Sequence, residues 1–522
     1  MKILARSSRF LVSNSTRKFG FVVAQDYNED FKEKIESQNM VKSDKQYRFA
    51  IVGSGPAGFY CGKQILKNTK NVRVDIFDRN PHPYGLVRTG VAPDHPEMKN
   101  IEKDYQEILK EQERCRFFGN VWVGTNNGIS LSKLRELYSG VVLAYGATSE
   151  RKLGLPNEFE LKGVLSSRQI ANWYNGSLDN NLDLEQDLDL SNVRDLAIIG
   201  NGNVAMDISR VFIKDPQLFH QFDAPSSVVE HLQKSKVKNV NIIGRRGVIQ
   251  SAFTIKEIRE ISRVKNVQMY MFREEYEDSR NNESIDELNA GYSPLSRGWN
   301  RRTEFLKDNC KFIDSEEQYL DVTHKNNEAK NFFLRYLQNP IELIGNDKGR
   351  ISGVKLQKQK LQGNIGNQKA VPDPSGKIST IECQLLIKSI GYQSQPIEGV
   401  PFNHKTHTVP HQYGCVVDQS GQIQPGLYVA GWLKRGPQGI IDATLRDSVE
   451  TFKIIKHHME CDMLPEKTTT IEDILKELPQ DSKTVNFDDW QQVDTVERHR
   501  GQEAGKSREK ILSKDEMLKI IK

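Results

Sequence analysis

The chain contains 522 residues, of which 27% are charged, and its formal net charge is +5. This length exceeds what one hydrophobic core usually supports, so at least two domains are expected. No apolar run approaches the roughly 18 residues that a membrane-spanning helix needs, and basic and acidic residues nearly balance. We therefore expect no transmembrane segment and no nucleic-acid partner.

The first 25 residues have the composition of a mitochondrial transit peptide. They contain five basic side chains, several serines and no acidic residue before Asp26, whereas a secretory signal would need a longer apolar stretch. The alternative is a disordered basic end with no targeting role. Residues 26–46 are polar and rich in Lys and Glu, which indicates a linker. Without the five basic residues the chain would be close to neutral, so an acidic partner would have to be recognised by a local basic patch.

A glycine-rich loop, Gly53-Ser-Gly-Pro-Ala-Gly58, follows the apolar run 49–52 and precedes a helical pattern of apolar residues. Gly53 permits a tight turn, Gly55 lets the backbone approach a pyrophosphate, and Gly58 lets helix and strand pack closely. The next apolar run ends at Asp78, about 20 residues past the last glycine, where a carboxylate binds an adenosine ribose. Strand, loop, helix and acid together predict a dinucleotide site rather than a simple glycine-rich turn.

A second loop of the same kind, Gly200-Asn-Gly-Asn-Val-Ala205, follows the apolar run 195–199. Its next apolar run, 240–243, leads into Arg245 and Arg246 instead of an acid. An acid would repel a 2'-phosphate, whereas arginine presents a planar fork of donors that matches phosphate geometry. The second site is therefore predicted to prefer NADP(H) over NAD(H). The alternative is that the two arginines are a solvated surface pair.

Two further apolar runs indicate where the chain crosses between domains. Residues 141–144 are predicted to return to the first sheet and then lead to a second domain, and residues 387–390 are predicted to cross back. The predicted fold class is α/β, with two Rossmann-like dinucleotide-binding domains of the glutathione-reductase type. An NADP-binding domain, residues 150–385, is inserted into an FAD-binding domain that is split into residues 47–149 and 386–522.

A late glycine-rich segment begins at Gly431, after the strand-like run 427–430. A helix that starts near Gly439 would direct its backbone N–H groups and positive dipole end at a bound group, which for a flavin favours the anionic reduced ring. Trp432 offers a flat apolar surface against which a ring could pack. The alternative for Trp432 is an ordinary core tryptophan.

The six cysteines are scattered along the chain with no CxxC spacing. This pattern excludes a local iron-sulfur or zinc motif and favours free thiols in a reducing compartment, so no metal site is expected. It also separates the chain from the small subunit of glutamate synthase and its relatives, which have similar dinucleotide domains but carry cysteine-rich cluster modules.

With these motifs the sequence resembles the mitochondrial NADPH:ferredoxin (adrenodoxin) oxidoreductase family. The two glycine loops alone would fit many flavoproteins. More discriminating are Val91-Ala-Pro-Asp-His-Pro96 and Trp432-Leu-Lys-Arg-Gly-Pro437, and Gly244-Arg-Arg-Gly247 also matches. A tail match around Asp489 extends the similarity over roughly residues 47–521.

The resemblance implies an enzyme that moves a hydride from NADPH to FAD and then passes single electrons to a small acidic [2Fe-2S] ferredoxin. It implies a location in the mitochondrial matrix, with peripheral association with the inner membrane. The residues it implies for FAD are Ala57, Asp78, Leu86, Val123, Trp432, Gly439, Ile440 and Ile441. Those it implies for NADP(H) are Asn201, Gly202, Asn203, Val204, Arg245, Arg246, Glu257 and Gly439. Asp78 departs from the family pattern, which more often has Glu at this position.

Two ionisable residues, His95 and Asp207, lie just beyond the two nucleotide segments. We hypothesise that they sit near the nicotinamide and flavin edges and relay a proton. The alternative is a structural role, which is the commoner one for a lone histidine or a helical aspartate.

Three basic residues, Arg297, Arg301 and Arg302, lie close together at the start of a predicted helix. Such a cluster could steer an acidic ferredoxin in a salt-sensitive way. A solvated helix face is the equally weighted alternative.

Two other function classes remain open from the sequence. One is a flavin subunit of a cluster-linked reductase, which the cysteine pattern disfavours. The other is a non-catalytic dinucleotide-binding scaffold in a respiratory assembly. Such a scaffold would keep the glycines but would not need to keep Arg245, Arg246 and Trp432 together.

Overall fold

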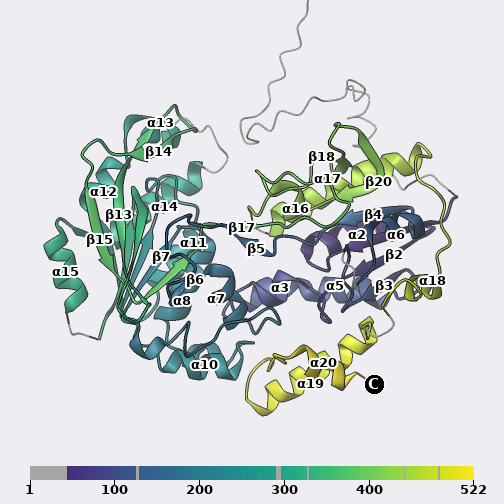
Figure 1. Ribbon diagram of the computed structural model, residues 1–522, viewed down its shortest axis with the longest axis horizontal. Coiled ribbons are helices and arrows are strands. Elements are labelled where there is room, and N and C mark those ends of the chain that lie inside the picture. Colours follow the sequence, from purple (N-terminus) through teal and green to yellow (C-terminus); the bar gives the residue numbers. More distant parts are fainter. Residues whose placement is uncertain are drawn as a thin grey trace, which may run out of the picture.

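The computed structural model describes Val41 and residues 44–124, 128–289, 296–325, 328–439, 441–479 and 483–521. These residues form two lobes that lie side by side (Figure 1). The predicted transit peptide, most of the predicted linker and Ile440 lie outside the described residues. Within the described part of the chain, no helix combines the length and apolar character that crossing a membrane requires.

The first lobe is built on a seven-stranded sheet with the order β18-β19-β20-β4-β1-β2-β3. Its parallel strands are β1 (Tyr47–Val52), β2 (Val72–Phe77), β3 (Cys115–Phe118), β4 (Gly140–Leu143) and β20 (Ile423–Val429). Helices cover both faces of such a sheet, so its strands read as continuous apolar runs. Two short antiparallel strands, β18 (His411–Gln412) and β19 (Cys415–Val417), extend one edge.

The helices of the first lobe come from two distant parts of the chain. Helix α2 packs against α17 within one hydrophobic core beside the sheet. The helices are α2 (Pro56–Asn68), α3 (Leu86–Thr89), α4 (Pro96–Lys99), α5 (Ile101–Lys110), α6 (Leu131–Leu137), α16 (Trp432–Arg435) and α17 (Ile441–Glu460). The C-terminal part of the chain therefore completes the domain that the first glycine loop opens.

The second lobe contains a seven-stranded sheet with the order β10-β9-β11-β8-β7-β16-β6. All of its strand pairs are parallel. The strands are β6 (Val164–Ser166), β7 (Asp195–Ile199), β8 (Asn239–Ile243), β9 (Val267–Phe272), β10 (Lys311–Ile313), β11 (Lys330–Arg335) and β16 (Leu385–Lys388).

Helices of the intervening segments pack on this second sheet. They are α7 (Ser167–Tyr174), α8 (Asn203–Ile213), α9 (Gln217–His220), α10 (Ser226–Gln233), α11 (Ile255–Ser262), α12 (Arg273–Asp278), α13 (Asn282–Asn289), α14 (Ser296–Asn309) and α15 (Glu316–His324). A smaller antiparallel sheet packs against the second sheet through a shared apolar cluster. Its strands are β12 (Gln338–Gly345), β13 (Ile351–Gln362), β14 (Lys369–Pro372) and β15 (Ile378–Glu382).

The fold is therefore α/β with two dinucleotide-binding domains, the second inserted into the first. The predicted boundary between residues 385 and 386 is wrong in detail, because it falls inside β16, which pairs with β7 in the second sheet. A short buried apolar strand reads the same in either sheet, so its pattern did not show which sheet it joins. The crossings between the lobes form a two-stranded ribbon of β5 (Ser149–Glu150) and β17 (Tyr392–Gln393), between the lobes in Figure 1.

The C-terminal segment contacts both lobes. It contains α18 (Ile471–Leu475), α19 (Phe487–Glu503) and α20 (Lys514–Ile520). Buried Glu497 pairs with Arg88 of the first lobe at 2.6 Å, and buried Lys510 pairs with Asp223 of the second lobe at 2.9 Å. The two lobes are thus joined by the ribbon and by this segment.

Candidate active site

The first glycine loop has the backbone geometry of a phosphate cradle. Gly53 has a φ of +109°, and a Cβ there would lie 2.6 Å from the carbonyl oxygen of Ala144. A Cβ on Gly58 would overlap the carbonyl oxygen of Gly53. Gly55, just before α2, would meet only Gly85, at 4.0 Å. Small residues thus keep side chains away from the start of α2, as the approach of a pyrophosphate to a helix N-terminus requires.

Asp78 lies directly after β2, beside this loop. Its carboxylate accepts hydrogen bonds from the backbone N–H and the hydroxyl of Ser54, at 2.9 and 2.6 Å, and from the N–H of Asn80 at 2.9 Å. Burial raises the pKa of Asp78, and these donors oppose that shift. Local hydrogen bonds thus hold the acid beside the glycine loop, just after the end of β2. Two other residues predicted for FAD differ in exposure, because Val123 is buried whereas Leu86 exposes 38% of its surface.

The late glycine segment meets the first loop. The N–H of Gly431 donates to the carboxylate of Asp447 at 2.5 Å, and a Cβ on Gly431 would lie 2.5 Å from the Cβ of Ala57. Trp432 is the first residue of α16, and its ring stacks on Tyr392 with 5.7 Å between centroids and 22° between planes. Helix α17 begins at Ile441, two residues after Gly439, which has a φ of +84°.

The second glycine loop repeats the geometry of the first. Gly200 has a φ of +115°, and a Cβ there would overlap the carbonyl oxygen of Ser389. A Cβ on Gly202 would meet nothing within 4 Å, so the backbone at the start of α8 faces open space. The side chain of Asn203 accepts the N–H of Thr254 at 2.9 Å and ties the loop to the segment before α11.

The Arg245–Arg246 turn lies beside the second loop. A Cβ on Gly244 would come within 2.7 Å of Asn201 Nδ2, so the turn and the loop are in contact. Both arginine side chains are exposed. Their guanidinium groups are therefore accessible to an anion at the carboxyl end of β8.

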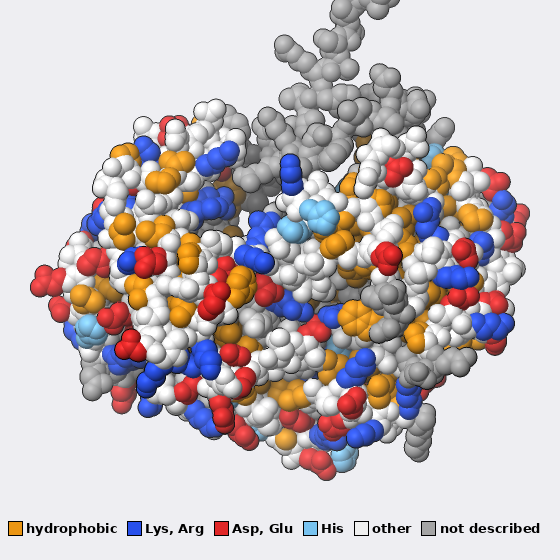
Figure 2. Space-filling view, in the orientation of Figure 1, with side chains coloured by type: hydrophobic (Ala, Val, Ile, Leu, Met, Phe, Trp, Pro, Cys, Tyr) orange, Lys and Arg blue, Asp and Glu red, His pale blue; other side chains and the backbone are white. Residues whose placement is uncertain are grey.

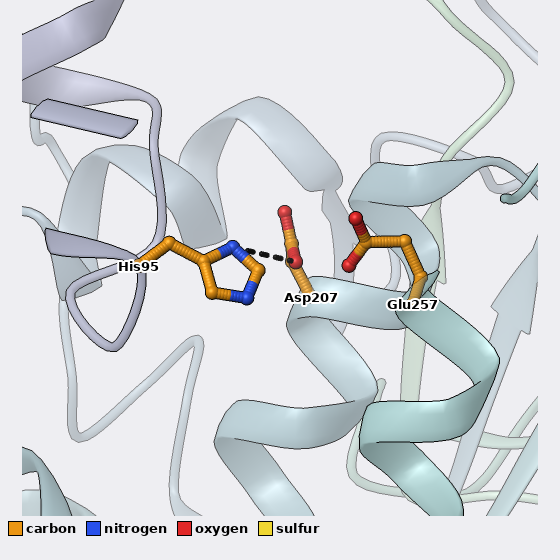
Figure 3. Close-up of side chains that lie close together, drawn as sticks. All are labelled: His95, Asp207 and Glu257. Atoms are coloured by element: carbon orange, nitrogen blue, oxygen red, sulfur yellow. Dashed lines mark ion pairs between the residues drawn. The ribbon is translucent and has the colours of Figure 1, made fainter. Parts of the chain in front are cut away.

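His95 and Asp207, which are far apart in sequence, come together at the junction of the lobes (Figure 3). His95 precedes α4 of the first lobe, and Asp207 and Glu257 lie on α8 and α11 of the second. His95 Nδ1 lies 4.0 Å from Asp207, and His95 Nε2 lies 2.7 Å from Glu260. The buried guanidinium of Arg210 contacts the carboxylates of this cluster: Asp94 at 2.7 Å, Asp207 at 2.9 Å, Glu260 at 3.2 Å and Glu257 at 3.6 Å.

This junction cluster has the electrostatics of a proton-holding group. Burial, and then the neighbouring Asp207 carboxylate, raises the pKa of Glu257 to about 7. Burial also raises the pKa of Asp207. One ligand atom from each of His95, Asp207 and Glu257 lies within 4.8 Å of the others. However, the positively charged Arg210 contacts the carboxylates of both Asp207 and Glu257 and would repel a bound cation. The arrangement therefore suits a proton better than a metal ion.

The structure corrects the predicted docking cluster. Arg301 is exposed, but Arg302 is only 3% exposed and donates to the carbonyl oxygens of Phe253 and Ile249, both at 2.8 Å. Arg302 therefore supports the core, because its side chain points inward from α14. The side chain of Arg297 lies outside the described residues. Arg259 on α11 is exposed, and its guanidinium lies 5.6 Å from the ring of Phe305 on α14.

Comparison with known proteins agrees with this geometry. A family model described as pyridine nucleotide-disulphide oxidoreductase matches residues 47–293. The mitochondrial NADPH:adrenodoxin oxidoreductase of Arabidopsis thaliana is 36% identical over 91% of this chain and 95% of its own length. The protein of the same name from Homo sapiens is 35% identical and covers 92% of both chains. The solved structure of Mycobacterium tuberculosis FprA in complex with NADPH has a TM-score of 0.75 and 29% identity, and covers 91% of this chain and 99% of its own.

The chain belongs to the NADPH:adrenodoxin oxidoreductase family. This reductase is an NADPH-dependent flavoprotein oxidoreductase with FAD and NADP(H) as cofactors, so the alternative of a non-catalytic scaffold is not retained. Its residues fit both groups. Gly55 and Gly202 each precede a helix and leave space where a side chain would otherwise stand, and the two strand ends carry opposite charges.

Sequence reasoning missed several residues of the site. Arg210 and Glu260 complete the junction cluster, and Arg259 is an exposed cation on α11, which packs against the helix that carries Arg301. The sequence spacing gave some indication of both residues. Glu260 follows Glu257 by three residues and Arg210 follows Asp207 by three, so each pair shares a helix face. Nothing in the sequence indicated that both faces point at His95.

Proposed function

We propose that this reductase passes electrons from NADPH through FAD to a small acidic [2Fe-2S] ferredoxin in the mitochondrial matrix. The observation that carries the proposal is the junction cluster, in which His95 of the FAD-binding domain meets Asp207 and Glu260 of the NADP-binding domain. This contact joins the first domain to α8, the helix that the second glycine loop opens, and so supports transfer between cofactors held in the two domains.

The first domain is proposed to hold FAD. When bound, FAD supplies the chemistry that accepts a hydride and releases electrons singly. In the proposal the N–H groups at Gly55 and the start of α2 hold the pyrophosphate, Asp78 holds the ribose, and Trp432 packs against the flavin. The resemblance adds Ala57, Leu86, Val123, Gly439, Ile440 and Ile441.

The second domain is proposed to hold NADP(H). The open space beside Gly202 at the start of α8 suits the pyrophosphate, and the exposed Arg245 and Arg246 suit the 2'-phosphate. Glu257 lies within the junction cluster and is proposed to contact the nicotinamide end. His95 and Asp207 are proposed to hold or release the proton that accompanies changes in flavin protonation.

Exposed arginines on two neighbouring helices support an acidic partner. Arg259 on α11 and Arg301 on α14 are exposed, and these helices pack together. Lys and Arg side chains also gather where the two lobes meet on the face shown in Figure 2. Such charges raise the rate of encounter with an acidic protein at low ionic strength.

The docking proposal is tested by charge reversal. The Arg259→Glu, Arg301→Glu double variant should lower ferredoxin-dependent turnover at low salt while reduction of the flavin by NADPH stays normal. Arg280→Glu is the matched control, because Arg280 is also exposed and also lies over an aromatic ring, 5.3 Å from Tyr276. Equal ferredoxin-dependent turnover in the double variant and in wild type at low salt would remove these two arginines from the interface.

The electron path is tested with the FAD-loaded full chain. Cytochrome c reduction is followed with NADPH or NADH, with and without a [2Fe-2S] ferredoxin. The proposal expects reduction that needs ferredoxin and strongly prefers NADPH. If NADPH reduces the flavin but ferredoxin adds nothing, the acceptor is wrong, and the flavin subunit of a cluster-linked reductase becomes the better description.

The proposed location is tested by fractionating cells that express the full chain. Protection from protease inside mitochondria, together with a shortened N-terminus, would support the matrix and the transit peptide. Carbonate extraction of the membrane fraction tests the predicted peripheral association with the inner membrane, since carbonate releases a peripheral protein.

A further inference from the structure

The Arg245–Arg246 turn is supported from outside its own segment. The N–H of Gly244 donates to the carbonyl of Arg335 at 2.8 Å, and the N–H of Gln338 donates to the carbonyl of Gly244 at 3.1 Å. The N–H of Leu337 donates to the carbonyl of Arg246 at 3.2 Å. Three backbone hydrogen bonds therefore connect the arginine turn to the connection between β11 and β12.

That connection is in turn organised by one buried carboxylate, Glu275 of α12. Glu275 is 3% exposed and accepts from the N–H of Tyr336 at 2.7 Å, from Nε of Arg335 at 2.9 Å and from Nε2 of Gln338 at 2.9 Å. Three donors thus converge on one side chain, from Arg335 at the end of β11, Tyr336 in the connection and Gln338 at the start of β12. Leu337 itself has a φ of +56°, which leucine rarely adopts unless its surroundings hold it there.

The Glu275–Arg335 pair is buried, and its arginine packs against an aromatic ring. The guanidinium of Arg335 is 1% exposed and lies 3.7 Å from the ring centroid of Phe272. A buried ion pair usually adds little net stability, because desolvation of both charges offsets their attraction. Its effect here is geometric, since it fixes the connection that holds the backbone of Gly244 and Arg246.

We propose that Glu275 is a positioning residue for recognition of the 2'-phosphate, acting through the β11–β12 connection on the Arg245–Arg246 turn. This inference rests on the proposed role of Arg245 and Arg246. It makes the preference for NADP(H) depend on a carboxylate that touches no nucleotide. Because the hydrogen bonds from this connection reach the dinucleotide site at the Arg245–Arg246 turn, loss of Glu275 should weaken binding of the phosphate and leave the rest of the site unchanged.

The variant that tests the inference is Glu275→Gln. The amide oxygen can still accept hydrogen bonds, but the amide NH2 cannot. At least one of the three hydrogen bonds that hold the β11–β12 connection is therefore lost. Arg335 also lies 3.3 Å from Glu316, so its charge keeps a partner in the variant. We expect roughly tenfold weaker binding of 2',5'-ADP to the FAD-loaded full chain by calorimetry, with binding of 5'-ADP unchanged. The KM for NADPH should rise by a similar factor, with kcat and the KM for NADH unchanged.

Asp75→Asn is the matched control. Asp75 is a fully buried carboxylate of the first sheet that pairs with Arg116 through two contacts of 2.6 Å and accepts the hydroxyl of Tyr138 at 2.8 Å. The control loses the same kind of ion pair far from the arginine turn. It should leave the ratio of 2',5'-ADP to 5'-ADP affinity as in wild type.

The outcomes separate the inference from the function on which it rests. The inference is overturned if Glu275→Gln binds 2',5'-ADP and 5'-ADP more weakly by the same factor. It is also overturned if Asp75→Asn changes the ratio of the two affinities as much as Glu275→Gln does. If Arg246→Ala leaves the preference for 2',5'-ADP intact, the proposed role of the arginine pair fails first. Should Glu275→Gln not fold, Gln338→Met removes one donor to the same carboxylate, and an unchanged affinity ratio in that variant also overturns the inference.

Discussion

The two dinucleotide loops share one backbone plan but end their second strands in opposite charges. After β2 the chain places Asp78, and after β8 it places Arg245 and Arg246. Asp78 is held by neighbours in its own unit, Ser54 and Asn80. The arginine turn is held instead by a connection roughly 90 residues further along the chain, and the partners of that connection include Glu275. We propose that similar folding units can select different cofactors through one or two side chains, and the support of those side chains need not be local.

The largest effect is expected when the basic residues that follow β8 are replaced by acidic ones, like the acid that follows β2. Arg245→Glu combined with Arg246→Glu should raise the KM for NADPH by roughly 100-fold or more, because each charge-assisted contact to a phosphate contributes about 1.5 to 3 kcal/mol. The KM for NADH should change little. Steady-state kinetics with both coenzymes measures the difference, and an equal rise for both would count against recognition of the 2'-phosphate by this pair.

The glycines of the second loop should respond differently from one another. Gly200→Ala places a Cβ on the carbonyl of Ser389 at a φ of +115°, and should destabilise the protein by about 1 to 3 kcal/mol. Gly202→Ala meets no atom within 4 Å and should keep the wild-type Tm while it weakens NADP binding. Thermal unfolding and calorimetry measure the two effects. A wild-type Tm for Gly200→Ala would show that the loop is more adaptable than its contacts indicate.

At the first strand end, Asp78→Asn should weaken FAD binding roughly tenfold. An amide NH2 would face the Ser54 or Asn80 donors, so one buried hydrogen bond is lost along with the ribose contact. Fluorescence titration of the apoprotein with FAD gives the affinity. Ser54→Ala, which removes only the supporting hydroxyl, should have a smaller effect, and the reverse order would contradict the proposed ribose role.

The smallest expected effect concerns the junction cluster, where the two units meet. Burial and Asp207 raise the pKa of Glu257 to about 7, above the value of about 4.3 expected in the unfolded chain. The folded state therefore binds more protons than the unfolded state in this window, and wild-type stability should fall as pH rises from about 4.5 to 7. The amide of Glu257→Gln cannot ionise. The Tm of this variant, relative to that of wild type, should therefore rise between about pH 4.5 and 7 and stay constant above pH 7.

A Tm difference between Glu257→Gln and wild type that does not change between pH 4.5 and 8 would contradict the raised pKa. The same variant, with His95→Ala and Asp207→Ala, tests the proton role. Normal rates of flavin reduction and reoxidation in all three variants would remove the proposed relay.

The sequence by itself determined the parts of this protein that depend on short stretches of chain. The two loops, the runs of their strands, Asp78 and the arginine pair were all readable, because a βαβ unit folds its own glycines, strand and helix start into one place. The α/β class and the insertion of one domain into the other followed from the order of these units.

Only the tertiary structure decided which distant residues meet and which way side chains point. It assigned β16 to the second sheet, turned Arg302 into the core, and surrounded His95 with Asp207, Glu260 and Arg210. It also placed Glu275 beneath the β11–β12 connection. Such contacts depend on the packing of whole elements, and a buried charge or apolar strand has the same local pattern whichever neighbour it finds. The physical reason is that periodicity records which face of an element is buried, but not the partner that buries it.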